Sequence, residues 1–462
     1  MTAADSTLKR LTEAYEQKEK EFLDAYFDCL RIPSVSSEPR HRDDVRRCAN
    51  WLVEHLSGAG FEARLWETSG HPVVFAESGP AEPSRPTALI YNHYDVQPVD
   101  PVEAWETPPF EPTVRDGQVY ARGAVDNKGQ CLYVIQALKT LMDLNGRLPV
   151  QVKLLIDGEE ESASPGLTAI VKDRAPELAA DHLLLVDGGF ANLDSPSVGL
   201  GVRGIVSLRV EVIGSKGDLH SGTHGGVVYN PLHALVEILG RLRDREGRIT
   251  VPGFYDDVAA LTEEERARFD FRFDAARYEA RFGARPVGGE RAYSPRESGT
   301  IRPTLEINGL AGGYGGDGFK TVIPARARAN LSCRLVPNQD PEVIGGLVAD
   351  FIKRQAPEGV EVRAVINPGR GRAVRNPPDA VVVQAAAQAY QDVLGRPCAF
   401  RLGGGSIPIM PLLTEASGAK AVLMGLSLDQ DNVHAPNEHF GLDRMKLGCV
   451  TLARTLELLA QA

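Results

Sequence analysis

Residues 150–161 read VQVKLLIDGEEE, an apolar run that ends in three consecutive glutamates. A short run rich in Val, Leu and Ile, bounded by polar residues, predicts a buried β-strand. The carboxylates of Glu159, Glu160 and Glu161 crowd together, and like charges destabilise one another. The stretch therefore predicts a strand whose carboxyl end carries either a solvated acidic turn or a site for a cation.

Two further runs have this form, TALIYNHYD (87–95) and HLLLVDGG (182–189). Helical patterns separate the three runs, at residues 127–146 and 166–179. Strand alternating with helix predicts an α/β domain whose sheet is largely parallel. Because open α/β sheets bind ligands beyond the carboxyl ends of their strands, we expect His93, Asp95 and Asp187 to lie near the glutamates. Two further helices are predicted before the first run, from about Asp5 to Pro33 and over 43–56.

The middle of the chain has a different pattern of strand, helix, two strands, helix and strand. This order is that of a small α+β ferredoxin-like sandwich, interrupted by a polar excursion from about Val251 to Thr300. The α/β pattern then returns. We therefore predict a discontinuous catalytic domain (1–203 and 373–462) and an inserted domain (204–372).

Composition excludes several classes of protein. The 462 residues are 43% hydrophobic and 24% charged, with a formal net charge of −11 and no long basic run. This argues against nucleic acid or an anionic membrane surface as a partner. No apolar stretch is long enough to span a bilayer, and there is no apolar signal core at the N-terminus. The six scattered cysteines lack a C-x-x-C pair and predict free thiols in a reducing cytoplasm.

Five groups carry candidate chemistry at predicted strand ends or loops: His93, Asp126, the glutamate triplet, Asp187 and His434. Imidazole and carboxylate ligands without thiolates suit zinc, manganese or cobalt. Two such ions bridged by a carboxylate form a site that can activate water for hydrolysis. Each histidine or aspartate taken alone is more often an ordinary core or surface residue.

The sequence then resembles one metallopeptidase family over nearly its whole length, from about Ile32 onward. The family contains aminoacylase, acetylornithine deacetylase, succinyl-diaminopimelate desuccinylase and the carnosine-type dipeptidases. Eight stretches occur in the family's order: NHYDVQP, RGAVDNKG, DGEEESASPGL, LLVDGG, DLHSG, SCRLVP, GGGSIP and NVHAPNE. The triplet and the long insert look most like the cytosolic dipeptidase branch.

The resemblance implies a zinc-exopeptidase type of catalytic domain that holds two divalent metal ions per subunit, Zn2+ first and Mn2+ or Co2+ otherwise. His93 and Asp187 would bind one ion, Glu161 and His434 the other, and Asp126 would bridge them. Asp95 would orient the imidazole of His93. The family also implies a cis peptide between Asp126 and Asn127, and a supporting role for Glu438 beside His434.

Alignment of Ser162 to Ser164 with the family sets the register of the glutamates. Glu160 would be the general base that takes a proton from metal-bound water and passes it to the leaving amine. Glu159 would take no part in the chemistry. Its side chain would be solvated or hydrogen-bonded, and its removal would have a mild effect on activity. A shift of one residue would make Glu159 the base.

The remaining motifs imply substrate contacts. Arg334 would pair with the free carboxylate of the substrate through two parallel hydrogen bonds. Gly404, Gly405 and Ser406 would donate hydrogen bonds to the same group. His220, in the inserted lid and dimerisation domain, would polarise the scissile carbonyl of the partner subunit in a homodimer.

The sequence thus predicts a cytoplasmic di-metal peptidase acting on dipeptides or similar short amides with a free carboxylate. An N-acyl-amino-acid or carbamoyl amidohydrolase uses the same chemistry on another acyl group and stays open as the alternative. A more distant alternative is a metal-free binding protein.

Overall fold

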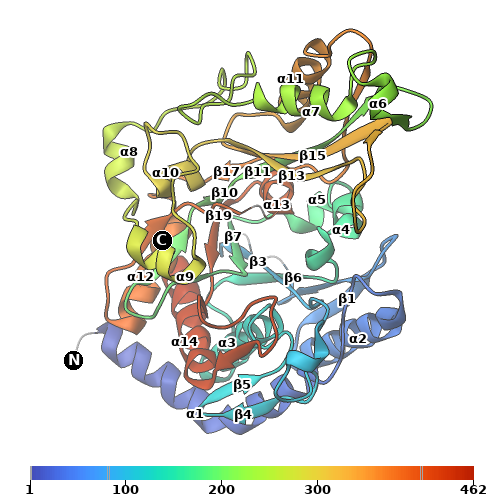
Figure 1. The fold of residues 1–462 in the computed structure, drawn as a ribbon. Helices are drawn as coiled ribbons and strands as arrows, with labels where there is room; N and C mark the ends of the chain where they lie inside the picture. The colour runs from blue at the N-terminus through green and yellow to red at the C-terminus, as the bar shows by residue number, and fades with distance from the viewer. Residues whose placement is uncertain (1–2, 81, 83, 406, 408) are drawn as a thin grey trace. The chain divides into compact units, whose positions relative to one another are not determined.

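The computed structural model describes residues 3–80, 82, 84–405, 407 and 409–462. The chain forms two compact units, coloured along the chain in Figure 1. Unit 1 comprises Met1–Gly201, Asn376–Arg401 and Ile409–Ala462, and unit 2 comprises Val202–Arg375 and Leu402–Pro408. The predicted division did not anticipate Leu402–Pro408 in unit 2, and the roles of the two domains stay predictions.

An eight-stranded sheet in the order β1-β2-β6-β3-β7-β19-β9-β18 forms the core of unit 1. Its strands are β1 (Glu62–Trp66), β2 (Val73–Glu77), β3 (Thr87–His93), β6 (Gln151–Asp157), β7 (His182–Val186), β9 (Ser197–Gly199), β18 (Ala399–Arg401) and β19 (Lys420–Met424). β3 pairs in parallel with both β6 and β7, and β7 pairs in parallel with β19. β1 and β2 add an antiparallel edge. The sheet is therefore mixed, with the predicted parallel strands at its centre.

Six of the helices that the structure describes surround this sheet; some pack on its strands and the others pack on those helices. They are α1 (Ala3–Leu30), α2 (Arg42–Gly58), α3 (Lys128–Asn145), α12 (Val381–Leu394), α13 (Ile409–Ser417) and α14 (Leu442–Leu459). α1 and α14, blue and red in Figure 1, come from opposite ends of the chain and pack against each other and against α3. The predicted first two helices match α1 and α2. The single helix predicted over 166–179 is instead two short ones, α4 (Pro165–Ile170) and α5 (Ala175–Leu178).

Small strand pairs and turns connect the main elements of unit 1. They are β4 (Thr113–Arg115), β5 (Gln118–Tyr120), β8 (Gly189–Phe190), β20 (Ser427–Leu428) and β21 (His439–Gly441). β21 pairs with β5, which joins the C-terminal segment to the segment that precedes Asp126. Single helical turns occur at Pro39–His41, Val102–Ala104 and Glu160–Ser162.

Unit 2 is the predicted ferredoxin-like sandwich. Its antiparallel sheet has the order β13-β15-β11-β16, from β11 (Gly204–Ile213), β13 (Thr304–Gly312), β15 (Arg326–Leu335) and β16 (Glu361–Ile366). Helices α7 (Pro231–Gly240) and α11 (Pro341–Arg354) lie on one side of this sheet in Figure 1. Alternate residues of β11, from Val206 to Val212, are fully buried against these helices, whereas Arg209 on the other face is exposed.

The excursion in unit 2 carries three short helices, α8 (Glu263–Arg268), α9 (Ala275–Phe282) and α10 (Pro295–Thr300). A buried ion pair anchors it, because the guanidinium of Arg302 donates to both oxygens of Glu290 at 2.8 and 3.1 Å. The remaining elements are β12 (Leu219–His220), α6 (Ser221–His224) and β14 (Val322–Ile323). β10 (Gly201–Val202) pairs with β17 (Val374–Arg375) where the chain passes from one unit to the other. Among the described residues, no helix has the length and apolarity needed to cross a membrane.

Candidate active site

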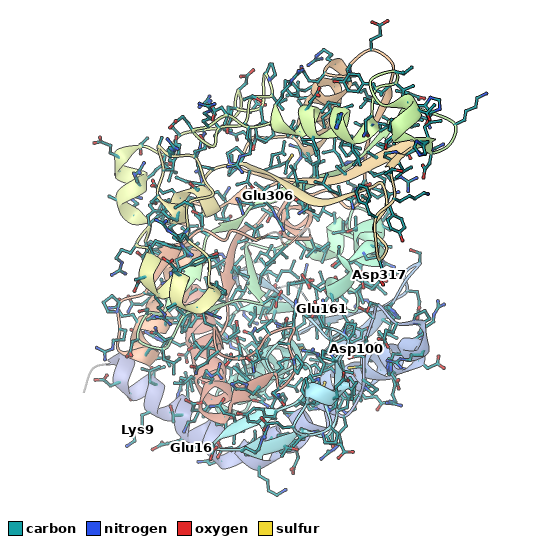
Figure 2. All side chains as sticks on the ribbon, viewed as in Figure 1. Lys9, Glu16, Asp100, Glu161, Glu306 and Asp317 are labelled. Carbon is teal, nitrogen blue, oxygen red and sulfur yellow. The ribbon has the colours of Figure 1, made fainter. Side chains whose placement is uncertain are left out.

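The candidate site of unit 1 lies at the carboxyl ends of three neighbouring strands. His93 is the last residue of β3, the glutamates follow β6, and Asp187 follows β7. These strands are adjacent and parallel, so their ends meet at one edge of the sheet, as the sequence predicts. The side chain of Glu161, labelled in Figure 2, is 4% exposed, whereas Lys9 and Glu16 on α1, also labelled there, are exposed.

A first group of potential ligands consists of His93, Glu160 and Asp187, whose ligand atoms all lie within 4.8 Å of one another. His93 Nε2 lies 3.5 Å from Asp187 Oδ1 and 3.2 Å from Asp126 Oδ1. The side chain of His93 is 1% exposed and that of Asp187 12% exposed. One imidazole nitrogen thus faces two carboxylates, that of Asp187 after β7 and that of Asp126 in the turn before α3.

A second group consists of Asp126, Glu161 and His434. His434 Nε2 lies 2.8 Å from Asp126 Oδ2 and 3.2 Å from Glu161 Oε2. Asp126 therefore directs Oδ1 toward the first histidine and Oδ2 toward the second. A single carboxylate that faces both groups has the arrangement that a bridging ligand requires.

One buried atom indicates that the second group suits a cation. Glu161 Oε1 is buried and has no hydrogen-bond partner, while Oε2 accepts a hydrogen bond from Gln97 Nε2 at 2.7 Å. A buried carboxylate oxygen without a donor is costly unless a positive charge compensates it. The nitrogen and oxygen donors of the two groups fit two divalent ions of the zinc, manganese or cobalt type.

Burial and neighbouring charges shift the pKa values of the titratable groups in this site, some upward and some downward. Burial, with the negative charge of Asp187 and the two neighbouring carboxylates, raises the pKa of Glu160 to about 9, although His93 opposes this shift. Hydrogen bonds with Asp126 and Glu161 raise the pKa of His434 to about 10. The same histidines hold the pKa of Asp126 below its usual value despite burial. The carboxylates therefore compete for the few positive charges available.

Asp95 connects the first histidine with the acidic turn. Its Oδ1 lies 3.3 Å from His93 Nδ1, and its backbone oxygen lies 3.1 Å from the same nitrogen. Its carboxylate also accepts the backbone N–H groups of Glu160 and Glu161 at 3.1 and 3.2 Å. Asp95 thus lies where the sequence predicts an orienting partner and additionally holds the turn of the glutamates.

The peptide bond between Asp126 and Asn127 is cis, as the resemblance implies. The Asn127 side chain is fully buried and was given no role from the sequence. Its amide nitrogen donates to Asp187 Oδ1 at 2.9 Å and to the Val186 oxygen at 3.0 Å, and its oxygen accepts from Asn92 at 2.7 Å. Asn127, Asn92 and Gln97 thus orient the candidate ligands. The only signal in the sequence is that each lies within four residues of a predicted ligand.

Glu159 is not a solvated spare residue. It is 6% exposed, and its Oε2 accepts the backbone N–H of Gly166 at 2.9 Å. Two glycines make room for it, because a Cβ added to Gly70 or Gly166 would come within 2.0 or 2.3 Å of its carboxylate. The hydrogen-bonded alternative holds for Glu159. The mild effect of its removal on activity stays a prediction, and a loss of stability is expected in addition.

The other predicted residues belong to unit 2. Arg334 is in β15, paired with Ile205 and Thr304, and its charge together with burial lowers the pKa of Arg203 to about 10. Arg203 holds the backbone of Gly404 and Gly405, donating from Nε to the Gly404 oxygen at 2.8 Å and from its backbone N–H to the Gly405 oxygen at 3.0 Å.

Two further residues complete the predicted set. His220 is exposed, and its Nδ1 accepts the backbone N–H of Gly222 at 3.1 Å. Ser406 lies outside the described residues.

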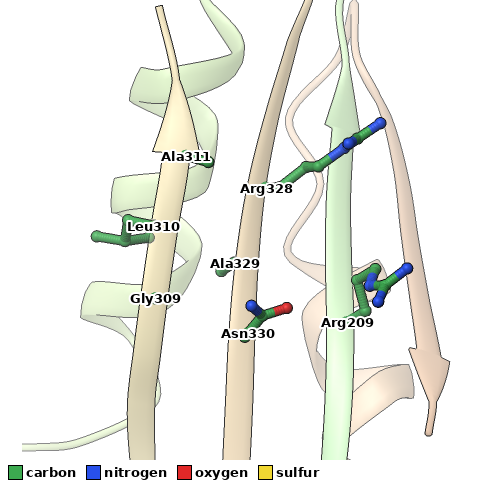
Figure 3. Close-up of a pocket in the computed structure, with 7 residues that line it drawn as sticks. All are labelled: Arg209, Gly309, Leu310, Ala311, Arg328, Ala329 and Asn330. Carbon is green, nitrogen blue, oxygen red and sulfur yellow. The ribbon is translucent and has the colours of Figure 1, made fainter. Parts of the chain in front are cut away.

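A hollow of about 390 Å³ lies on the sheet of unit 2 (Figure 3). It is lined by Arg209, Gly309, Leu310, Ala311, Arg328, Ala329 and Asn330. The ladder between β13 and β15 is irregular between Ile307 and Gly309, and Leu310 and Ala311 follow. None of the predicted site residues lines this hollow, so it does not bear on the candidate chemistry.

Comparison with known proteins gives a consistent result. A family model described as peptidase family M20/M25/M40 matches residues 89–458. A Cys-Gly metallodipeptidase of Schizosaccharomyces pombe is 30% identical, with 96% of each chain covered. The β-Ala-His dipeptidase of Homo sapiens is 33% identical, over 93% of this chain and 88% of that one.

Solved structures of similar sequence share the fold. An M20 family metallo-carboxypeptidase from Sulfolobus solfataricus is 34% identical, with a TM-score of 0.83 over 96% of this chain and 100% of that one. A dipeptidase from Saccharomyces cerevisiae is 28% identical, with a TM-score of 0.81 over 98% and 99%.

The packing of Glu159 leads to a stability prediction. Glu159→Ala leaves the Gly166 N–H without an acceptor and should lower the free energy of unfolding by about 1–3 kcal/mol, measured by urea denaturation. The kcat of the folded variant should stay near the wild-type value, because Glu159 belongs to neither ligand group.

A double-mutant cycle tests the contact between Gly70 and the Glu159 carboxylate. Gly70→Ala should destabilise the wild type, since the new methyl group displaces the Glu159 carboxylate from its hydrogen bond, and should cost less in the Glu159→Ala background. Additive effects of the two changes would contradict the contact. Loss of turnover in well-folded Glu159→Ala would show that Glu159 acts in the chemistry.

Proposed function

This chain belongs to peptidase family M20/M25/M40, and from that membership we propose that it is a di-metal dipeptidase acting on short amides with a free carboxylate. The membership makes it a metal-dependent hydrolase. The dipeptidases of Schizosaccharomyces pombe and Homo sapiens reported above support dipeptides as the substrate class. The observation that carries the proposal is the carboxylate of Asp126, which faces both groups of candidate ligands.

In the proposed mechanism, His93 and Asp187 would hold one ion, Glu161 and His434 would hold the other, and Asp126 would serve both. Bound ions of this kind lower the pKa of water and polarise the substrate carbonyl. Glu160 takes the proton of the attacking water as its oxygen joins the acyl carbon. Glu160 then gives that proton to the leaving nitrogen as the C–N bond breaks. Glu160 lies within 4.8 Å of the ligand atoms of both His93 and Asp187, and a base for metal-bound water has to lie this close to the ion, which supports the role.

The substrate's free carboxylate is proposed to pair with Arg334 and to accept hydrogen bonds from Gly404, Gly405 and Ser406. The two hydrogen bonds from Arg203 to the backbone oxygens of Gly404 and Gly405 support a fixed backbone at these two glycines. A deacylase would use the same carboxylate subsite with a different acyl group, so it stays the alternative. A metal-free binding protein would not need the two complete ligand groups.

The finer assignments are also proposals. Zn2+ is proposed as the metal because imidazole and carboxylate ligands suit it, with Mn2+ or Co2+ as the other candidates. A cytoplasmic, reducing location is supported by the six cysteines, all of which are free thiols. The proposed active form is a homodimer in which His220 serves the site of the partner subunit.

The roles of two neighbouring glutamates can be separated by metal content. Glu160→Gln should lower kcat by about 10²–10⁴-fold, since the general base is lost, and should retain two ions per chain. Glu161→Gln should lose one ion as well as activity. Ions are counted by mass spectrometry of the purified, dialysed proteins. Loss of an ion from Glu160→Gln would make Glu160 a ligand instead of the base.

Arg334 is tested with a panel of dipeptides, amidated dipeptides, N-blocked dipeptides and N-acetyl amino acids. The wild type should prefer dipeptides with a free carboxylate. Arg334→Lys should raise KM for these by about tenfold or more, because lysine cannot form the paired hydrogen bonds, and should barely change the poor amidated substrates. Equal losses on both would indicate a role in folding, and activity on N-acetyl amino acids alone would favour the deacylase.

The role of His220 in the partner's site is tested by coexpressing Glu160→Ala and His220→Ala, each inactive alone. Half of randomly paired dimers are mixed, and each mixed dimer has one site with both residues intact. About a quarter of the wild-type activity should therefore return. A verified mixed dimer without activity would show that His220 acts in its own subunit.

A further inference from the structure

Glu438 is a buried carboxylate that lies in the same loop as His434 but does not contact it. Glu438 and Arg122 are each 1% exposed. Glu438 directly precedes β21, and Arg122 follows β5, with which β21 pairs. The backbone oxygen of Glu438 accepts the N–H of Ala121 at 3.2 Å, so the two segments are joined beside both residues.

The carboxylate of Glu438 accepts four hydrogen bonds, two on each oxygen. Oε2 accepts from Arg122 Nη1 at 2.7 Å and from the backbone N–H of Gly123 at 2.9 Å. Oε1 accepts from the backbone N–H groups of Val125 at 2.9 Å and Asp126 at 3.0 Å. Three of the four donors are thus main-chain groups of the segment that ends at Asp126.

This arrangement differs from an ordinary buried ion pair. An ion pair alone would use the two donors of one guanidinium edge, but here Arg122 donates only Nη1 to Glu438 and directs Nη2 to the Pro98 oxygen at 2.9 Å. A carboxylate that gathers several backbone N–H groups fixes the path of the main chain around it. The main chain fixed here includes the amide of Asp126 itself.

The loop of Glu438 is held at a second point. The Asn437 side chain accepts the backbone N–H of Glu106 at 2.9 Å and donates to the Ala104 oxygen at 3.0 Å. His434 lies four residues before Glu438, and both His434 and Asn437 have positive φ, at 61° and 60°. The loop is thus tied to the segment of Asp126 by Glu438 and to residues 104–106 by Asn437.

We propose that Glu438, with Arg122, is the positioning residue that sets the place of Asp126 relative to His434 and thereby the affinity of unit 1 for its divalent ions. The proposal rests on the di-metal function proposed above. Glu438 itself touches neither ion nor substrate. It acts through the main chain of one candidate ligand and through its own loop on the other.

The isosteric change Glu438→Gln tests this role. The new side-chain amide has one oxygen and one NH2 group, and the NH2 group cannot accept a hydrogen bond. In either orientation the NH2 group faces two N–H donors, those of Val125 and Asp126 or those of Arg122 and Gly123. We expect the affinity of the metal-stripped protein for Zn2+ or Mn2+ to fall about 10–100-fold, measured by competition with a chromophoric chelator. Activity lost at stoichiometric metal should return with excess metal, with KM unchanged.

The matched control is Asp392→Asn. Asp392 accepts from Arg454 Nε at 2.8 Å and from Gln388, and it joins α12 to α14 within the same unit. This variant should lose thermal stability and keep the wild-type affinity for metal. If Glu438→Gln behaves like Asp392→Asn, with a lower Tm and unchanged metal affinity, Glu438 is only structural and the proposal is wrong.

Two further results keep the outcomes distinct. If Glu438→Gln does not fold, the same titration of Glu438→Asp, which keeps the charge and shortens the side chain, should show the loss of affinity, and an unchanged affinity there overturns the proposal. A wild type that binds two ions but hydrolyses no amide contradicts the proposed function and leaves the positioning role testable by affinity. A wild type that binds no ions overturns both.

Discussion

Negative charge concentrated at one edge of a buried sheet is the constraint around which unit 1 is organised. Asp126, Glu161 and Asp187 have side chains that are 15%, 4% and 12% exposed, and the imidazoles of His93 and His434 face them. Burying carboxylates without compensation is expensive, and removing one partner from such a group leaves the others unpaired. Neighbouring side-chain amides donate to Glu161 and Asp187, while the other oxygen of Glu161 is buried without a hydrogen-bond partner, as the proposed cation site requires.

The hydrogen-bond donors to the carboxylates in and around this site are mostly backbone N–H groups and uncharged side-chain amides. Asp95 accepts the N–H groups of the glutamate turn, and Asn127 donates to Asp187. Glu438 accepts the N–H groups of the segment before Asp126. Hydrogen bonds of this kind orient carboxylates without neutralising them, so the candidate ligands keep the charge that the proposed ions require. A site built with additional arginines or lysines at these places would hold its carboxylates but compete with the metal.

The strand ends were predictable because apolar runs followed by His93, Glu159–Glu161 and Asp187 mark both the strand and its polar terminus. The ferredoxin-like order of unit 2 was predictable for the same reason, since hydrophobic periodicity reports burial directly. The burial of Glu159 was not predictable. It depends on the space left by Gly70 and Gly166, and a glycine in a sequence does not reveal which side chain approaches it. The contacts of Glu438 were not predictable either, because every residue except proline carries a backbone N–H, and the sequence does not show which of these groups donate to a side chain.

The order of the ligands along the chain has a consequence for biosynthesis. His93, Asp126, Glu161 and Asp187 precede unit 2, whereas His434 and Glu438 follow it. A ribosome therefore completes His93, Asp126, Glu161 and Asp187 well before it supplies His434, the third side chain of the second candidate group, and Glu438, which accepts the backbone N–H of Asp126. Unit 2, with its own core, can fold in that interval. The nascent chain thus exposes a half-built acidic site until the last strand of the central sheet, β19, and helix α14 have emerged.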